Sequence, residues 1–168
     1  GKYKESIRPI LVNSWEAAYF DFDGDTLYEL AKEAKNVGID MLVLDDGWFG
    51  ERENDQEALG DWQDNLGKLP DGLGGLSAKI HAMGLKFGIW VEPEMISENS
   101  KLYREHPEYA VRIPGKAAAV GRNQMLLDLT QTKVQDRIIA DMSDVFRRGQ
   151  VDYVKWDMNR HMSDYYSP

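Results

Sequence analysis

The chain has 168 residues, of which 42% are hydrophobic and 29% are charged, and this length suits one packed domain. Its formal net charge of −9 argues against nucleic acid as a partner, because phosphates are met by a surplus of Lys and Arg. The absence of Cys excludes disulfides and thiolate metal sites. Since the sequence has no signal-peptide pattern and no apolar run of about 20 residues, we expect a cytoplasmic protein without membrane contact.

The first half of the chain predicts two strands separated by a helix. A short apolar run within residues 9–16 is typical of a strand that is buried on both faces. The helix that follows has Asp23 or Asp25 as its N-cap and Gly38 at its end. A second strand is expected near residues 40–46, and the polar stretch after it predicts a long loop.

A second helix and a third strand come next. Apolar residues at helical spacing from Leu73 to Met83 predict the helix, which Gly84 ends. The third strand is expected near residues 86–92. A helical turn around residues 101–105 precedes an irregular stretch.

The last part of the chain predicts a long helix and a fourth strand. Residues 125–129 are ambiguous, and a short extra strand is left open there. A strong apolar stripe over residues 134–146 predicts a helix that ends at Gly149, and the fourth strand is expected near residues 151–157. Strands that alternate with helices indicate right-handed βαβ units, so we predict an α/β fold with parallel strands in a single domain over residues 1–168.

Polar and aromatic residues follow each predicted strand. In parallel α/β sheets the chemistry gathers at the carboxyl ends of the strands, so these residues should converge on one rim. The four clusters are Trp15 with Glu16, Asp45 with Asp46, Trp90 with Glu92, and Lys155 with Asp157.

Three of these clusters also have a simpler interpretation. Asp45 and Asp46 followed by Gly are alone typical of a solvated turn, and Trp90 fits the core as well as it fits a platform for a sugar ring. Lys155 and Asp157 lie two positions apart, so a strand points them to the same side. The cation would lower the pKa of the carboxyl, which suits a nucleophile rather than a general acid. A surface ion pair is the alternative.

No metal site is predicted. Asp21, Asp23 and Asp25 begin like a calcium loop, but Thr26 stands where such a loop needs Gly and Lys32 where it needs Glu. Helix capping explains these residues better. The three histidines lack zinc-type spacing.

Six sequence blocks carry a resemblance to a known family. They are Trp15-Glu16-Ala17-Ala18, Leu44-Asp45-Asp46-Gly47-Trp48-Phe49, Leu59-Gly60-Asp61-Trp62, Phe87-Gly88-Ile89-Trp90-Val91-Glu92-Pro93-Glu94-Met95, Gly121-Arg122-Asn123-Gln124 and Tyr153-Val154-Lys155-Trp156-Asp157-Met158-Asn159-Arg160. In this order, and over nearly the whole chain, they resemble the signature blocks of the α-galactosidases of glycoside hydrolase family 36.

The resemblance implies a retaining α-galactosidase that acts on melibiose- and raffinose-type sugars, with a (β/α)8 catalytic barrel and no metal or organic cofactor. It implies that Asp157 is the nucleophile. The positions that match the family's galactose-binding residues are Asp45, Asp46, Trp90, Arg122 and Lys155.

Two parts of such an enzyme are not expected in this chain. A retaining glycosidase needs a second carboxyl as acid/base, which the family takes from a later strand, and a complete barrel takes roughly 250 residues. We therefore expect a (β/α)4 half of a TIM-type barrel with weak or no activity, completed as a homodimer because its two outer strands would be open edges. The alternatives are an inactive half-barrel scaffold that self-associates and a residual galactose-binding module.

Overall fold

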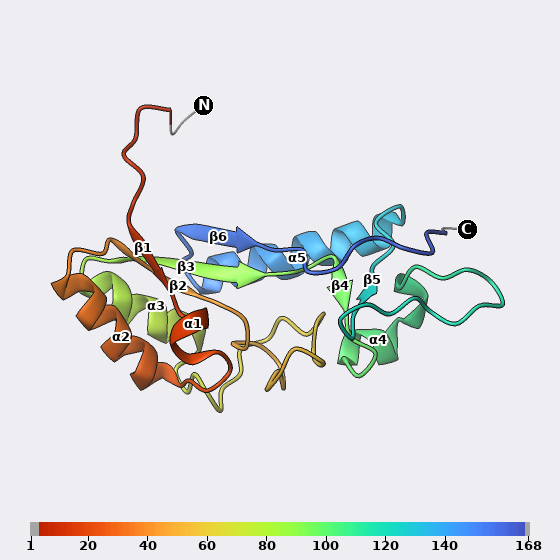
Figure 1. The fold of residues 1–168 in the computed structure, drawn as a ribbon, viewed down its shortest axis with the longest axis horizontal. Coiled ribbons are helices and arrows are strands. Elements are labelled where there is room, and N and C mark those ends of the chain that lie inside the picture. Colours follow the sequence, from red (N-terminus) through yellow and green to blue (C-terminus); the bar gives the residue numbers. More distant parts are fainter. Residues whose placement is uncertain (1–3, 167–168) are drawn as a thin grey trace.

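A parallel four-stranded sheet forms the centre of the molecule (Figure 1), whose computed structural model describes residues 4–166. The predicted domain also includes residues 1–3 and 167–168, which lie outside the described range. The strand order is β1-β2-β3-β6. These strands are β1 (Leu11–Asn13), β2 (Met41–Leu44), β3 (Lys86–Val91) and β6 (Tyr153–Trp156). The four strands lie within the four predicted ranges, and the α/β class with a parallel sheet is confirmed.

Three long helices connect these strands: α2 (Gly24–Asn36), α3 (Gly72–Ala82) and α5 (Thr132–Arg148). Asp23 caps α2, because its carboxylate accepts a hydrogen bond from the N–H of Thr26 at 2.8 Å. α2 and α3 lie side by side against one face of the sheet (Figure 1), and α5 joins the same core through Met142 and Val145. None of the helices within residues 4–166 is long and apolar enough to cross a membrane.

The main core lies between the sheet and these helices. Alternate residues of β2 and β3 point toward the helices, and Leu42, Leu44, Phe87 and Ile89 are fully buried there. Burial of each such side chain stabilises the fold by about 1.5–3 kcal/mol. The residues that alternate with these along each strand point to the opposite face of the sheet.

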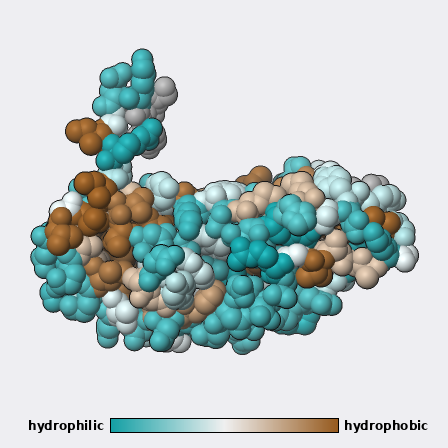
Figure 2. Space-filling model, viewed as in Figure 1, coloured by the Kyte–Doolittle hydropathy of each residue, from teal (hydrophilic) through white to brown (hydrophobic). Residues whose placement is uncertain are grey.

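β1 differs from the prediction of a strand that is buried on both faces. Ile10 is 60% exposed and Leu11 is 40% exposed. The reason is the place of β1 at the edge of the sheet, where β2 is its only partner strand among residues 4–166. Val37, the C-cap of α2, is also exposed, at 79%. Figure 2 shows hydrophobic surface gathered at this end of the molecule.

An insertion between β3 and α5 forms a small second layer. Its antiparallel pair consists of β4 (Met95–Ile96) and β5 (Met125–Leu126), and α4 (Lys101–Glu105) with a 3-10 turn (Pro107–Tyr109) lies between them in sequence. The extra strand left open at residues 125–129 is present as β5, which covers only the first two of them. β4 was not predicted, because two residues carry no periodic signal.

The long loop after β2 is confirmed, and it is anchored by aromatic residues. Trp48, Phe49 and Trp62 are at most 3% exposed. Their rings cluster with one another and with Trp90 at centroid distances of 4.4–6.5 Å. This packing fixes the loop over the carboxyl end of the sheet.

Candidate active site

One face of the sheet carries the polar residues at the strand ends. Alternation along the strands sends Asn13, Asp45, Trp90, Lys155 and Asp157 to the side opposite the helices. A cavity of about 230 Å³ opens there. The six residues predicted from the sequence all line it: Asp45, Asp46, Trp90, Arg122, Lys155 and Asp157. Trp15, Asp55 and Asn159 complete the lining.

Asp45 is held from three sides. Its Oδ2 accepts hydrogen bonds from Lys155 Nζ at 2.8 Å and from Asn13 Nδ2 at 2.6 Å, and its Oδ1 accepts one from the N–H of Asp46 at 2.9 Å. An ionised carboxylate has about four acceptor sites, so one remains for a ligand. The predicted pairing of Lys155 with Asp157 is corrected here, because the carboxylate that Lys155 contacts is that of Asp45.

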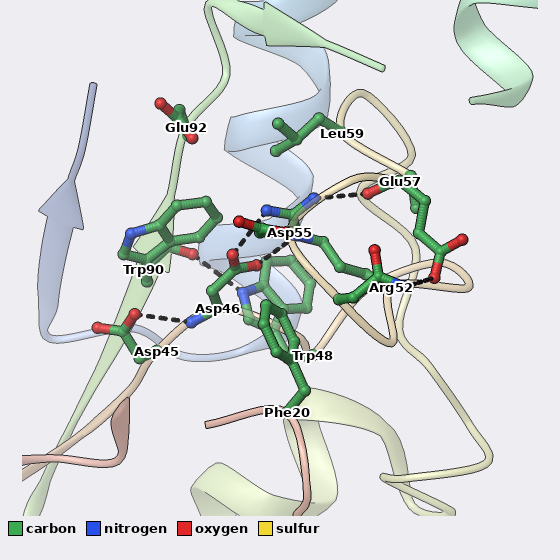
Figure 3. Close-up of polar contacts among 12 residues, drawn as sticks. Phe20, Asp45, Asp46, Trp48, Arg52, Asp55, Glu57, Leu59, Trp90 and Glu92 are labelled. Carbon is green, nitrogen blue, oxygen red and sulfur yellow. Dashed lines mark hydrogen bonds and ion pairs between the residues drawn. The ribbon is translucent and has the colours of Figure 1, made fainter. Parts of the chain in front are cut away.

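Asp46 faces a buried guanidinium. Arg52 donates from Nε to Oδ1 at 2.6 Å and from Nη2 to Oδ2 at 2.7 Å (Figure 3). The side chains of Arg52 and Asp46 are 1% and 8% exposed. Burial raises the pKa of Asp46, and the guanidinium acts against that rise. Gly47 follows with φ +103°, a conformation that L-residues avoid, and a Cβ there would come within 2.9 Å of Phe20.

Trp90 is packed rather than open. It is 2% exposed, its ring stacks on that of Phe49 with an interplanar angle of 3°, and its carbonyl accepts the indole N–H of Trp48 at 2.9 Å. The Nε1–H of Trp90 donates to Asp157 Oδ2 at 2.9 Å. Its burial matches the core reading, while its indole N–H reaches the site. Stacking on a sugar stays a prediction.

Asp157 is surrounded by hydrogen-bond donors. Its Oδ2 accepts from Trp90 and from Asn159 Nδ2 at 2.9 Å, and its Oδ1 accepts from the N–H of Met158 at 2.9 Å. Burial raises the pKa of Asp157, but these donors and the charge of Lys155 together bring it below its ordinary value. The predicted direction is confirmed, although Lys155 contributes less than the hydrogen bonds. Oδ1, with one donor, keeps the greater freedom to meet an electrophile.

Arg122 reaches the cavity from a tight turn. Its φ is +52°, and Gly121 and Gln124 close the turn with two backbone hydrogen bonds of 3.0 Å. Arg122 Nη1 donates to Asn159 Oδ1 at 3.2 Å, and its Nη2 lies 4.0 Å from Asp55 Oδ2. This half-exposed cation thus contacts the segment after β6 and approaches the loop after β2.

Two of the residues predicted at the rim lie elsewhere. Glu16 is exposed on α1 (Trp15–Ala18), where it accepts a hydrogen bond from the Tyr19 hydroxyl at 3.1 Å. Glu92 is fully buried, and its Oε1 accepts the N–H of Asn159. Burial raises the pKa of Glu92. Glu92 therefore holds the segment after β6 through Asn159 and does not line the cavity.

Two lining residues, Asp55 and Asn159, were missed from the sequence, and so was Asn13, which donates to Asp45. Asn13 had a usable signal, because it ends β1 in the same alternation as the other inward residues. Asn159 belongs to the same sequence block as Asp157, but no role was predicted for it. Asp55 lies in the long loop, where no periodicity exists to predict its direction. Residues 4–166 contain no cluster of three or more His, Asp and Glu able to hold a metal ion.

The fold agrees with the family comparison. The Melibiase family model matches residues 1–168, and the chain belongs to this family. It is 55% identical over 166 residues to the bifunctional alpha-galactosidase/sucrose kinase AgaSK of Mediterraneibacter gnavus, covering 99% of this chain and 18% of that protein. It is 49% identical to the alpha-galactosidase AgaA of Geobacillus stearothermophilus, covering 98% of this chain and 22% of that protein.

Solved structures of α-galactosidases show the same similarity to this chain. The galactosidase domain of AgaSK superposes with a TM-score of 0.96 over 99% of this chain and 23% of that one. A variant of AgaA in complex with raffinose, 48% identical, superposes with a TM-score of 0.97 over the same shares. The chain thus spans about a fifth of the length of the curated relatives that it matches.

Proposed function

We propose that this chain supplies the nucleophile and the galactose-binding face of a retaining α-galactosidase. The observation that carries the proposal is the environment of Asp157, whose ionised carboxylate lies in a cavity with Asp45, Asp46 and Lys155. The relatives are described as α-galactosidases, and one of them was solved with raffinose.

The lining residues divide into acceptors and donors for sugar hydroxyls. Asp45 has about one acceptor site left after its protein contacts, and Asp46 has about one left beside Arg52 and the N–H of Gly47. Each carboxylate would accept one hydroxyl. Lys155 and Arg122 would donate to others. A neutral sugar suits this balance of charges better than an anion, because acidic groups outnumber cations in the lining.

Asp157 would attack the anomeric carbon of the galactosyl group. Oδ1 forms a bond to C1 while the bond from C1 to the leaving oxygen breaks, and that oxygen keeps the electron pair and takes a proton from an acid. Water then attacks C1 of the galactosyl-enzyme and restores the carboxylate. Two inversions give retention at C1.

We propose that the acid/base carboxyl comes from outside this chain. The carboxylates of Asp45 and Asp46 are each engaged by a cation, Lys155 and Arg52, so neither is placed to serve as the acid/base. The chain alone would hydrolyse natural galactosides slowly or not at all. Substrates with activated leaving groups need little acid assistance, so they would still react with Asp157.

Galactose binding tests the recognition half of the proposal. In calorimetric titrations, D-galactose should bind the parent chain, and Lys155→Met should weaken binding by about 10-fold or more, because it removes a charged donor and leaves Asp45 without its counter-charge. Lys32→Met, an exposed lysine on α2, is the matched control and should bind like the parent. Equal affinity in the parent and in Lys155→Met would contradict the role of Lys155.

We further propose that the sheet is half of an eight-stranded barrel and that two copies join to complete it. β1 and β6 have no outer partner strand among residues 4–166, and Leu11 and Tyr153 on the inward side of these strands are 40% and 42% exposed. A two-fold arrangement would set β6 of one copy beside β1 of the other.

Light scattering tests this assembly. We expect a dimer at micromolar concentration for the parent chain and a monomer for Leu11→Lys, because a charge on an edge strand opposes strand pairing. Ile7→Lys, at a position 97% exposed before β1, is the control and should stay dimeric. A well-folded monomeric parent would refute the dimer. A dimer that neither binds galactose nor reacts would instead favour a structural scaffold.

A further inference from the structure

The guanidinium of Arg52 is buried and makes three hydrogen bonds inside the protein. Besides the two bonds to Asp46, its Nη1 donates to the carbonyl of Glu57 at 2.6 Å, and the residue is 1% exposed (Figure 3). Asp46, at 6% exposure, is the carboxylate that balances it. A buried guanidinium that makes three hydrogen bonds, two of them to one carboxylate, is fixed in orientation, since rotation would break charge-assisted bonds.

Aromatic rings flank the same guanidinium. Its central carbon lies 5.9 Å from the ring centroid of Phe20 and 5.6 Å from that of Phe49. Phe49 in turn stacks on Trp90, whose indole N–H reaches Asp157. Arg52 therefore joins the carboxylate after β2 to the packing that supports the nucleophile.

The backbone of this loop is anchored independently of the Arg52 side chain. Lys68 Nζ donates to the carbonyl of Phe20 at 2.9 Å and to the carbonyl of Arg52 at 3.3 Å, and it forms an ion pair with Glu53 at 3.1 Å. Trp48 and Phe49 remain packed in the core. None of these contacts involves the side chain of residue 52, so its variants are suited to a test in folded protein.

The ionised form of Asp46 depends on this contact. Burial raises the pKa of Asp46 and the neighbouring charge of Asp45 raises it further, while the hydrogen bonds and charge of Arg52 lower it. Without the guanidinium, Asp46 would bind a proton at higher pH. A protonated and freely rotating carboxyl would then present a donor where a sugar hydroxyl needs an acceptor.

We propose that Arg52 is a positioning residue for sugar recognition, whose bidentate contact holds the Asp46 carboxylate in the orientation in which it accepts one hydroxyl of a galactosyl group. This inference rests on the proposed function, because it assigns the ligand of Asp46. Arg52 itself does not line the cavity and acts through the carboxylate.

The test compares galactose binding of the parent chain, Arg52→Lys and Arg52→Ala by calorimetry across pH. Arg52→Lys keeps the charge but loses the bidentate fork, and we expect binding weaker by about 10-fold. Arg52→Ala should bind weakly, should lose the remaining affinity at higher pH than the parent as pH falls, and should recover affinity when methylguanidinium is added. Near-UV circular dichroism confirms that each variant is folded. Arg147→Ala, with its side chain 74% exposed, is the control.

The outcomes separate the two proposals. Parent-like binding in Arg52→Lys and Arg52→Ala overturns the positioning role alone. Weak binding in folded Arg52→Ala with neither a shifted pH profile nor recovery by methylguanidinium also overturns it, since a purely structural residue behaves in that way. A parent chain that does not bind galactose refutes the proposed function and this inference with it. Weakening with recovery supports both.

Discussion

Replacing Asp157 by alanine will abolish the rapid release of phenol that we expect when the chain meets an aryl α-galactoside with an activated leaving group. The parent carries a carboxylate with a lowered pKa in the cavity, and such a substrate needs little acid assistance. The first step should be faster than hydrolysis of the galactosyl-enzyme, because no base is assigned to this chain. Phenol should therefore appear as a burst of about one equivalent per active site.

The expected size of this effect is large. Removing a catalytic nucleophile lowers rates by about 10⁴- to 10⁶-fold, which would take the burst below detection. Stopped-flow absorbance of the released phenol measures it. Asp136→Ala, an exposed carboxylate on α5, is the control and should keep the full burst. A burst of equal size in Asp157→Ala would show that another group reacts with the sugar.

Breaking the Arg52–Asp46 pair should lower the free energy of unfolding more than any other exchange of a charged residue proposed above. Removing one member leaves the other charge buried and without a counter-charge, which costs about 3–5 kcal/mol. Arg52→Met and Asp46→Leu should each show this loss in urea unfolding. The double variant should be more stable than the sum of the two losses predicts, since it leaves no buried charge unpaired.

An exposed ion pair provides the comparison for this cycle. Lys79 and Asp71 are 2.9 Å apart, but their side chains are 51% and 64% exposed, so Lys79→Met should leave the urea midpoint unchanged. Losses that simply add in the double variant would mean that Arg52 and Asp46 contribute independently, against the bidentate contact. Positioning by Arg52 would then have no energetic basis.

Periodicity predicted most of the fold. The third strand and the helical turn before Pro107 were expected at the residues that β3 and α4 occupy, because flanking Gly and Pro limit both. Burial of β1 was predicted wrongly, since an apolar run does not tell whether its strand is central or at an edge. Where a strand lies in the sheet is a long-range property.

The site was predictable as a set of residues but not as a set of contacts. Alternation on a strand brought Lys155 and Asp157 to one side correctly. The partner of Lys155 is Asp45, 110 residues earlier in the chain, and only the sheet order β2-β3-β6 brings them together. Arg52 was missed for a similar reason. It lies in a loop without periodicity, and a charged residue there is usually exposed.

The burial of Trp90 is a second property that the sequence did not predict. Its position after an apolar strand was compatible with a sugar platform and with the core. The rings of Phe49 and Trp62 pack against that of Trp90, and these residues come from a loop whose path the sequence does not specify. The indole N–H nevertheless serves the site through Asp157.

Peptide mapping after a rapid acid quench tests the central claim most directly, namely that Asp157 attacks the sugar. The parent chain is mixed with an activated aryl α-galactoside, quenched within the burst, digested and analysed by tandem mass spectrometry. We expect one galactosyl adduct, carried by the peptide that contains Asp157 and absent from Asp157→Asn. An adduct on another carboxylate of the cavity, such as Asp45, Asp46 or Asp55, would contradict the assignment.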